Sequence, residues 1–313
     1  SSGFIGQSYD SGLEEGFKIA TADNTYFAVQ TLGLLMNDWL GYSTQRDEII
    51  QFINDLQLPT GGFLNDEDTG IDSLNPFFEP NLLASYYCIK TLEVFGMEGS
   101  IRISDFHQFL DDIYNSNYNF FRISQWDYGI NYTNIVATAL GLELSDITNY
   151  GNINRNGVLA FILGNRNSLG NWDQSTTVNH HELIDTFQII RSLQNSQEIS
   201  QLSLDDKNQI GNATLSYYHY TGFSHLSNDY TSMNLIHTIL SSFDLFDRIS
   251  ELDIQNIYSK IKDSYLQTFT QPFANSFSGY LMKSPEFVGL RSHPIEYYTT
   301  GNKNYIDSIS QLY

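Results

Sequence analysis

Cysteine, proline and positive charge are scarce in this chain of 313 residues. Cys88 is the single cysteine, which excludes an internal disulfide and a structural zinc site built on cysteines. The six prolines leave room for long uninterrupted helices. Fifteen Lys and Arg against 36 Asp and Glu give a net charge of −21. That balance argues against a nucleic-acid backbone as the partner, because binding phosphates requires a basic surface.

Long apolar runs are also missing. No stretch approaches the roughly 18–20 apolar residues that a helix needs to cross a bilayer, so we expect no membrane insertion. The sequence starts Ser-Ser-Gly without a methionine or an apolar leader, and we expect a trimmed product. We expect a soluble protein; a cytoplasmic location is favoured, and secretion stays open.

What the chain does contain is a repeated phrase. "FINDLQLPTGGF" at 52–63 returns as "FILGNRNSLGNW" at 161–172, with Gly170 matching Gly61 and Trp172 matching Phe63. Weaker copies place further aromatic anchors at Phe4, Phe120, Phe223 and Tyr280. Glycine permits a sharp turn after a helix, and the preceding Gln57 or Arg166 can bond the exposed carbonyls at that helix end. The phrase therefore predicts a joint used once per repeat.

Each joint lies between helical segments of two kinds. The first kind is mostly apolar, with Leu32, Leu92, Leu140, Leu193 and Leu240 in one proposed register; it covers 25–36, 82–95, 134–144, 183–193 and 230–243. The second kind is amphipathic and covers, for example, 43–57, 104–115 and 249–269, with N-caps expected at Ser43, Ser104 and Ser250. Nothing has the alternating pattern of a strand.

A helix that is apolar nearly all round must be buried on several sides. Five or six such helices at a near-constant interval can shelter one another by closing into a ring, with the amphipathic helices outside. The sequence predicts an all-α fold: an α/α toroid of about five to six helical-hairpin repeats, with inner and outer rings, as one domain over 1–313. An open superhelix is the alternative.

The Gln-to-aromatic (QW-like) phrase, together with "DNTYFAVQTLGLL" at 23–35, resembles the repeat of the squalene–hopene cyclase and protein prenyltransferase β-subunit superfamily. The resemblance implies a toroid with an apolar, aromatic-lined central cavity that holds an isoprenoid chain or a peptide. The Asp-x-Asp-Asp acid of the cyclases is absent here. Cys88 has no aspartate two residues before it, so the zinc-binding Asp-x-Cys pair of the prenyltransferases is absent too. We expect Cys88 to be a small buried hydrophobe.

Polar residues near the start of the apolar helices would meet at one end of the ring. They are catalytic candidates because carboxylates and imidazoles can deliver a proton or bind a cation; helix capping and surface exposure are the alternatives. These candidates are Asp23, Asp66, Asp68, Asp173, His180 and His181. Candidate metal ligands, for zinc or magnesium, are Asp173, His180, His219 and His225.

Aromatic residues on the apolar helices are candidates for substrate binding, with plain core packing as the alternative. They are Tyr26, Tyr86, Tyr87, Phe187 and Tyr230. The leading functional hypothesis is an isoprenoid-handling enzyme, terpene cyclase-like or prenyltransferase-like, with a polar, acidic mouth. A non-catalytic toroid that binds a peptide or apolar ligand is the alternative. A polysaccharide lyase or hydrolase that uses His180, His181 and tyrosines is the third hypothesis.

Overall fold

The computed structural model describes residues 3–4, 19–35, 39–66, 79–125, 133–168, 170–172, 180–221, 240–255, 257, 265–266 and 289–290. The chain divides into two compact units. Unit 1 comprises 1–5, 19–166 and 188–200, and unit 2 comprises 6–18, 167–187 and 201–313. A single domain over the whole chain stays a prediction.

Four of the predicted apolar helices are confirmed. They are α1 (Ala22–Leu35), α3 (Leu82–Val94), α5 (Thr133–Ile147) and α7 (His180–Asn195). Residues 240–245 are helical as well, whereas 230–239 lie outside the described residues. We call these the inner helices.

The amphipathic helices alternate with the inner helices along the chain. They are α2 (Ser43–Asp55), α4 (Ile103–Ile113), α6 (Arg155–Gly164) and α8 (Leu204–Thr221). A short 3-10 helix comes before four of the helical segments in the described part of the chain. These are η2 (Leu40–Tyr42) before α2, η4 (Glu98–Ser100) before α4, η5 (Ile199–Gln201) before α8 and η6 (Ile249–Glu251) before the helical residues 254–255. The expected helix over 249–269 is wrong at both ends, because it opens with η6 and Tyr265–Leu266 is a strand.

Two small antiparallel ladders contradict the expectation that the chain has no strands. β1 (Tyr114–Asn115) pairs with β2 (Phe120–Phe121), Tyr114 opposite Phe121. β3 (Tyr265–Leu266) pairs with β4 (Gly289–Leu290), Tyr265 opposite Leu290. Each strand has only two residues, which is too short for an alternating sequence pattern to reveal it.

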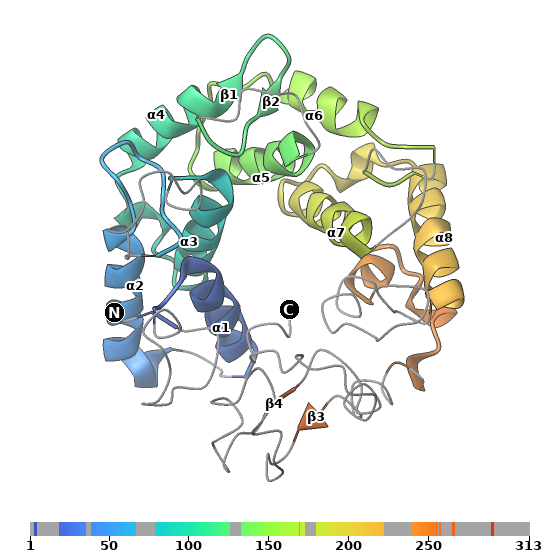
Figure 1. The fold of residues 1–313 in the computed structure, drawn as a ribbon, viewed down its shortest axis with the longest axis horizontal. Coiled ribbons are helices and arrows are strands. Elements are labelled where there is room, and N and C mark those ends of the chain that lie inside the picture. Colours follow the sequence, from blue (N-terminus) through green and yellow to red (C-terminus); the bar gives the residue numbers. More distant parts are fainter. Residues whose placement is uncertain are drawn as a thin grey trace, which may run out of the picture. The chain divides into compact units, whose positions relative to one another are not determined.

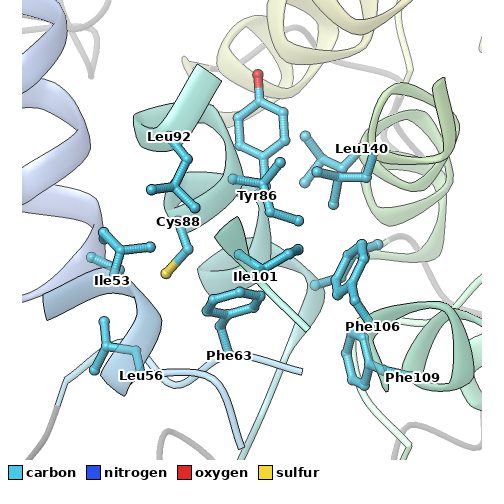
Figure 2. Close-up of a cluster of buried hydrophobic side chains, with 14 of the residues drawn as sticks. Ile53, Leu56, Phe63, Tyr86, Cys88, Leu92, Ile101, Phe106, Phe109 and Leu140 are labelled. Atoms are coloured by element: carbon cyan, nitrogen blue, oxygen red, sulfur yellow. The ribbon is translucent and has the colours of Figure 1, made fainter. Parts of the chain in front are cut away.

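Unit 1 is built from two layers of helices. Figure 1 shows α1, α3 and α5 side by side in one layer and α2, α4 and α6 in the other, and α3 packs against both α1 and α5. The core between the layers is apolar. Figure 2 shows Phe63, Cys88 and Phe106 within it, while the hydroxyl of Tyr86 points away from this cluster. The buried face of α3 thus packs on the core, and Tyr86 extends beyond it.

The repeated phrase forms the predicted joint. Gly61 and Gly170 have φ values of 93° and 89°, in the left-handed region that favours glycine. Phe63 and Trp172 are fully buried. Gln57 donates through Nε2 to the carbonyls of Gly61 (3.0 Å) and Arg102 (3.2 Å), and its Oε1 accepts from the Arg102 N–H at 2.8 Å. One amide side chain therefore closes the joint and holds the start of the next outer helix.

A second hydrogen bond recurs at each joint. A side-chain hydroxyl near the start of the inner helix accepts it from the backbone N–H of the aromatic anchor. The four pairs are Phe4–Thr25 (2.9 Å), Phe63–Ser85 (3.2 Å), Phe121–Thr138 (3.0 Å) and Trp172–Thr186 (3.3 Å). The third anchor is therefore Phe121, and the assignment to Phe120 was off by one. Two adjacent phenylalanines, both buried, could not be separated by sequence pattern.

The inner helices also end alike. Gly96, Asn149, Gln197 and Asp247 all have φ between 55° and 64°. The next N–H after each reaches back five residues, to the carbonyls of Leu92, Ser145, Leu193 and Phe243. These equivalences show that Leu140 and Leu240 do not share the register of Leu92 and Leu193. Leucines are frequent in every turn of these helices, so a leucine pattern does not fix the register.

The expected serine caps are wrong. Neither α2 nor α4 has a side-chain cap; their N-caps are Tyr42 and Arg102, and Ser250 lies inside η6. The 3-10 turn before α2 and the Gln57 contact at Arg102 occupy the places of the caps. Asparagines at 81 and 154 cap α3 and α6 instead. Ser203 and Asp206 form a reciprocal capping box at the start of α8.

Gly61→Ala should destabilise the protein much more than Gly96→Ala. A Cβ at Gly61 would lie 1.8 Å from the carbonyl oxygen of Asp105, whereas a Cβ at Gly96 meets nothing within 4 Å. Both substitutions place an alanine at a left-handed φ, which costs about 1 kcal/mol. We expect a total loss of about 3 kcal/mol or more for Gly61→Ala, because the backbone must move. Urea unfolding followed by circular dichroism measures the free energy of unfolding of both variants. Equal losses would contradict the claim that close backbone packing at the joint requires Gly61.

Candidate functional site

Four aromatic rings from α1 and α3 pack together in unit 1. The ring centres of Tyr26 and Phe27 are 5.1 Å apart, and those of Tyr26 and Tyr87 are 5.4 Å apart. Tyr86 meets the edges of Tyr26 and Tyr87 at about 6 Å, with centroid distances of 6.2 and 6.0 Å. Tyr26 and Tyr86 are buried, whereas Phe27 and Tyr87 keep part of their surface exposed. The predicted residues Tyr26, Tyr86 and Tyr87 are therefore brought together.

Arg191 of α7 joins this aromatic group. Its Nη2 donates to the hydroxyls of Tyr26 (2.6 Å) and Tyr86 (2.7 Å). The guanidinium carbon is also 5.9 Å from the ring centre of Tyr26 and 5.8 Å from that of Tyr86, within cation–π range. Among the described residues, no carboxylate forms an ion pair with Arg191. Two phenols hold the cation in place.

Glu143 of α5 is the second centre of the cluster and is only 1% exposed. Its Oε1 accepts from Lys90 Nζ at 3.0 Å and from Asn195 Nδ2 at 2.7 Å, and lies 3.5 Å from the Tyr86 hydroxyl. Its Oε2 accepts from Ser192 Oγ at 2.9 Å. Buried carboxylates are costly unless they are paired and hydrogen-bonded, and this one is both. Glu143 thereby ties α3 and α7 to α5.

Burial and pairing act in opposite directions on the cations. Burial disfavours the charge of Lys90, but Glu143 and Glu93 outweigh it, so the pKa of Lys90 is raised. Arg191 likewise loses hydration, yet the phenol oxygens of Tyr86 and Tyr26 raise its pKa. Burial raises the pKa of Tyr86 and of Tyr87, which keeps both phenols protonated. Lys90 and Arg191 are therefore cations at neutral pH, whereas the phenols of Tyr86 and Tyr87 are uncharged.

Sequence reasoning missed Lys90, Glu143 and Arg191, although a signal was present. Each stands five residues after the hydroxyl residue of its helix, namely Ser85, Thr138 or Thr186. Gln30 holds the same position after Thr25 in α1. A polar or charged residue at one fixed place in otherwise apolar helices could have been found by aligning the helices on these hydroxyls.

Of the acidic candidates, Asp23 and Asp66 belong to neighbouring segments. The Asp23 N–H donates to Asn65 Oδ1 at 3.4 Å, and Asn65 Nδ2 donates to the Asp23 carboxylate at the same distance. Thr21 forms a bridge with Asp66. Asp23 therefore has a local bonding role at the start of α1, and its catalytic role stays a prediction.

The remaining candidates are placed only in part. Phe187 is buried and belongs to unit 2. His180 and His181 begin α7 and His219 lies in α8, but their side chains are outside the described residues. Asp68, Asp173, His225 and Tyr230 lie outside the described residues altogether. Their proposed catalytic, metal-binding and substrate-binding roles stay predictions.

The described residues do not offer a metal-binding group. No set of three or more His, Cys, Asp or Glu side chains gathers among them in a way that could hold an ion. Cys88 is fully buried in the apolar core, and burial raises the pKa of its thiol, which disfavours the thiolate that zinc requires. The expectation that Cys88 is a buried hydrophobe is confirmed.

Glu143→Ala should be strongly destabilising, because it leaves Lys90, Ser192 and Asn195 without their shared acceptor. We expect a loss of about 3 kcal/mol, the usual cost of breaking a buried ion pair. Glu93→Gln is the matched control: its side chain is 43% exposed and also pairs with Lys90, so we expect less than about 1 kcal/mol. Urea unfolding compares them. A Glu143→Ala protein as stable as Glu93→Gln would show that the cluster contributes nothing to the fold.

Asp185 of α7 predicts a pH dependence of stability. Burial raises the pKa of its carboxyl from 3.8 to about 7. A raised pKa in the folded state means that stability is full below the unfolded pKa and is lost as pH rises from about 4 through about 7. Asp185→Asn should therefore be more stable than the parent at pH 8 and close to it at pH 4. Thermal unfolding at both pH values measures this; a variant with no advantage at pH 8 would contradict it.

Comparison with known proteins agrees with this architecture. A solved structure of Candida albicans protein geranylgeranyltransferase-I complexed with GGPP matches with a TM-score of 0.58, over 88% of this chain and 79% of that chain. The sequences are 14% identical, so this match shows the fold alone. No curated protein sequence matches the chain. None of the described helices is both long and apolar enough to span a membrane.

The family model of the prenyltransferase alpha-alpha toroid domain matches residues 1–77 and 78–265, which together make up most of the chain. The predicted all-α toroid and the resemblance to the prenyltransferase-like superfamily are confirmed. The chain belongs to the prenyltransferase alpha-alpha toroid family.

Proposed function

We propose that this protein binds an isoprenoid-class ligand, an elongated unsaturated apolar molecule, on the aromatic residues of α1 and α3. The observation that carries the proposal is the four-ring group beside Arg191. Phe27 and Tyr87 keep exposed surface, and Arg191 lies against the hydroxyls of the two buried rings. An apolar surface next to a small number of fixed polar groups suits a ligand with one polar end.

Physical chemistry supports an isoprenoid as the apolar part. Covering apolar surface contributes about 25 cal/mol per Å², so a long hydrocarbon chain gains affinity from contact area alone. The related geranylgeranyltransferase structure contains GGPP, whose geranylgeranyl chain is such a hydrocarbon. Family membership and the aromatic group therefore point in the same direction.

Turnover is a further step within the same hypothesis. A terpene cyclase-like or prenyltransferase-like reaction would place the reacting polar end near Arg191, Tyr26 and Tyr86. The absence of the Asp-x-Asp-Asp and Asp-x-Cys strings favours the second candidate, a non-catalytic toroid that binds an apolar ligand or a peptide. Binding is common to both and is tested first.

Equilibrium dialysis with radiolabelled farnesol, geranylgeraniol and their diphosphates measures this binding. Tyr87→Ala should weaken the binding of each ligand that binds by about tenfold, equal to about 1.4 kcal/mol. Tyr118→Ala is the matched control, since Tyr118 is 60% exposed in the β1–β2 turn and is not part of the aromatic group. Failure of every prenyl compound to bind, or equal losses in both variants, would overturn the proposal. Mass spectrometry of the incubated ligands separates the enzyme from the binding module.

A further inference from the structure

We infer that the ligand's polar end carries at most one negative charge, as in a prenyl alcohol or a prenyl carboxylate, and that a free diphosphate is disfavoured. This inference rests on the proposed function, and it names the head group that the same cluster accepts. It is argued from the donors of Arg191 and from the charges that surround them.

The first step is the donor set. Both hydrogens of Arg191 Nη2 are directed to the hydroxyls of Tyr26 and Tyr86. A bidentate grip on a carboxylate or phosphate normally uses two parallel N–H groups that include Nη2. With Nη2 committed, Nε and Nη1 remain, and they diverge. Arg191 is therefore suited to one or two single-oxygen contacts and not to the several oxygens of a diphosphate.

The phenols add little for an anion. Each hydroxyl accepts from Arg191, so its own hydrogen must point elsewhere. The Tyr86 hydroxyl lies 3.5 Å from Glu143 Oε1, which leaves the Tyr26 hydroxyl as a donor with no acceptor among the described residues. One phenol donor next to one cation matches an alcohol oxygen or a carboxylate.

The second step is the charge balance. The described cations of the cluster are Arg191 and Lys90, and Lys90 is already paired with Glu143 and Glu93. Asp23 is a third carboxylate near the rings, since its charge adds to the effect of burial in raising the pKa of Tyr87. Two cations and three carboxylates sum to −1, in a chain whose net charge is −21. A diphosphate, with about three negative charges, would be repelled in this setting.

A divalent cation could offset that repulsion. Among the described residues, no group of three acidic or imidazole side chains stands ready to hold one. The comparison of head groups is therefore made both with a chelator and with Mg²⁺ added.

The experiment keeps the hydrocarbon constant and changes only the head. Equilibrium dialysis of the full chain against farnesol, farnesoic acid and farnesyl diphosphate is run in EDTA and in Mg²⁺. We expect the alcohol and the carboxylate to bind at least about tenfold tighter than the diphosphate in EDTA. A diphosphate that binds as tightly as farnesoic acid in EDTA overturns the inference and leaves the proposed function standing. The same series is run with the geranylgeranyl compounds, and if no farnesyl or geranylgeranyl compound binds under either condition, the proposed function fails.

Two variants test the cause. Arg191→Gln should weaken the binding of farnesoic acid about tenfold and the binding of farnesol much less, because only the carboxylate depends on the guanidinium charge. Asp23→Asn keeps a side-chain oxygen that can accept the hydrogen bond from Asn65, and it removes one negative charge. It should therefore raise the affinity for farnesyl diphosphate several-fold. Glu48→Gln, on the exposed face of α2, changes the net charge equally and is its control. If Asp23→Asn gains no more than Glu48→Gln, the local charge argument is overturned.

Discussion

The hydrogen bond between a loop N–H and a hydroxyl on the following inner helix fixes how far each inner helix extends past its joint. Thr25, Ser85, Thr138 and Thr186 accept this bond from Phe4, Phe63, Phe121 and Trp172. An aromatic ring that is buried at the joint cannot shift along the helix without losing its packing. Its backbone N–H can therefore reach a hydroxyl at only one position of the inner helix. This contact therefore sets the position along the helix axis of every later residue in the inner helix, including the residue five positions after the hydroxyl residue.

That inheritance explains how charges come to lie together in apolar helices. Lys90, Glu143 and Arg191 hold the same position relative to the hydroxyls of their helices, and all three lie in unit 1. Buried charges are tolerated only when their partners are at the right height. Glu143 has the partners it needs because α3 and α7 present Lys90 and Ser192 at its level. The repeat therefore acts as a positioning device for a polar cluster, besides building the core.

The sequence was sufficient to predict what depends on backbone freedom and on long periodic segments. Gly61 and Gly170 mark the joints because only glycine takes their φ cheaply, and the inner helices were found because their apolar content runs over many turns. The family resemblance rested on these same features.

The failures have physical reasons as well. Ser43 and Ser104 were expected to cap helices, yet a 3-10 turn and the distant Gln57 take their places, and neither competitor can be read from the local sequence. Leu140 was put in the wrong register because leucine side chains pack equally well at several heights. The polar cluster was missed because Lys90 and Glu143 are far apart in the chain and become partners only through tertiary packing.

A cluster that satisfies its own charges also limits what it can bind. Lys90 contributes no free charge to a ligand, because Glu143 and Glu93 already neutralise it, and removing that neutralisation would leave a buried cation in an apolar layer. Stability and anion affinity therefore compete for the same lysine. Arg191 differs from Lys90, because its hydrogen-bond partners among the described residues are the phenols of Tyr26 and Tyr86, and no described carboxylate is ion-paired with it. Under the proposed function, Arg191 is therefore the cation of the cluster that would attract the polar end of a ligand.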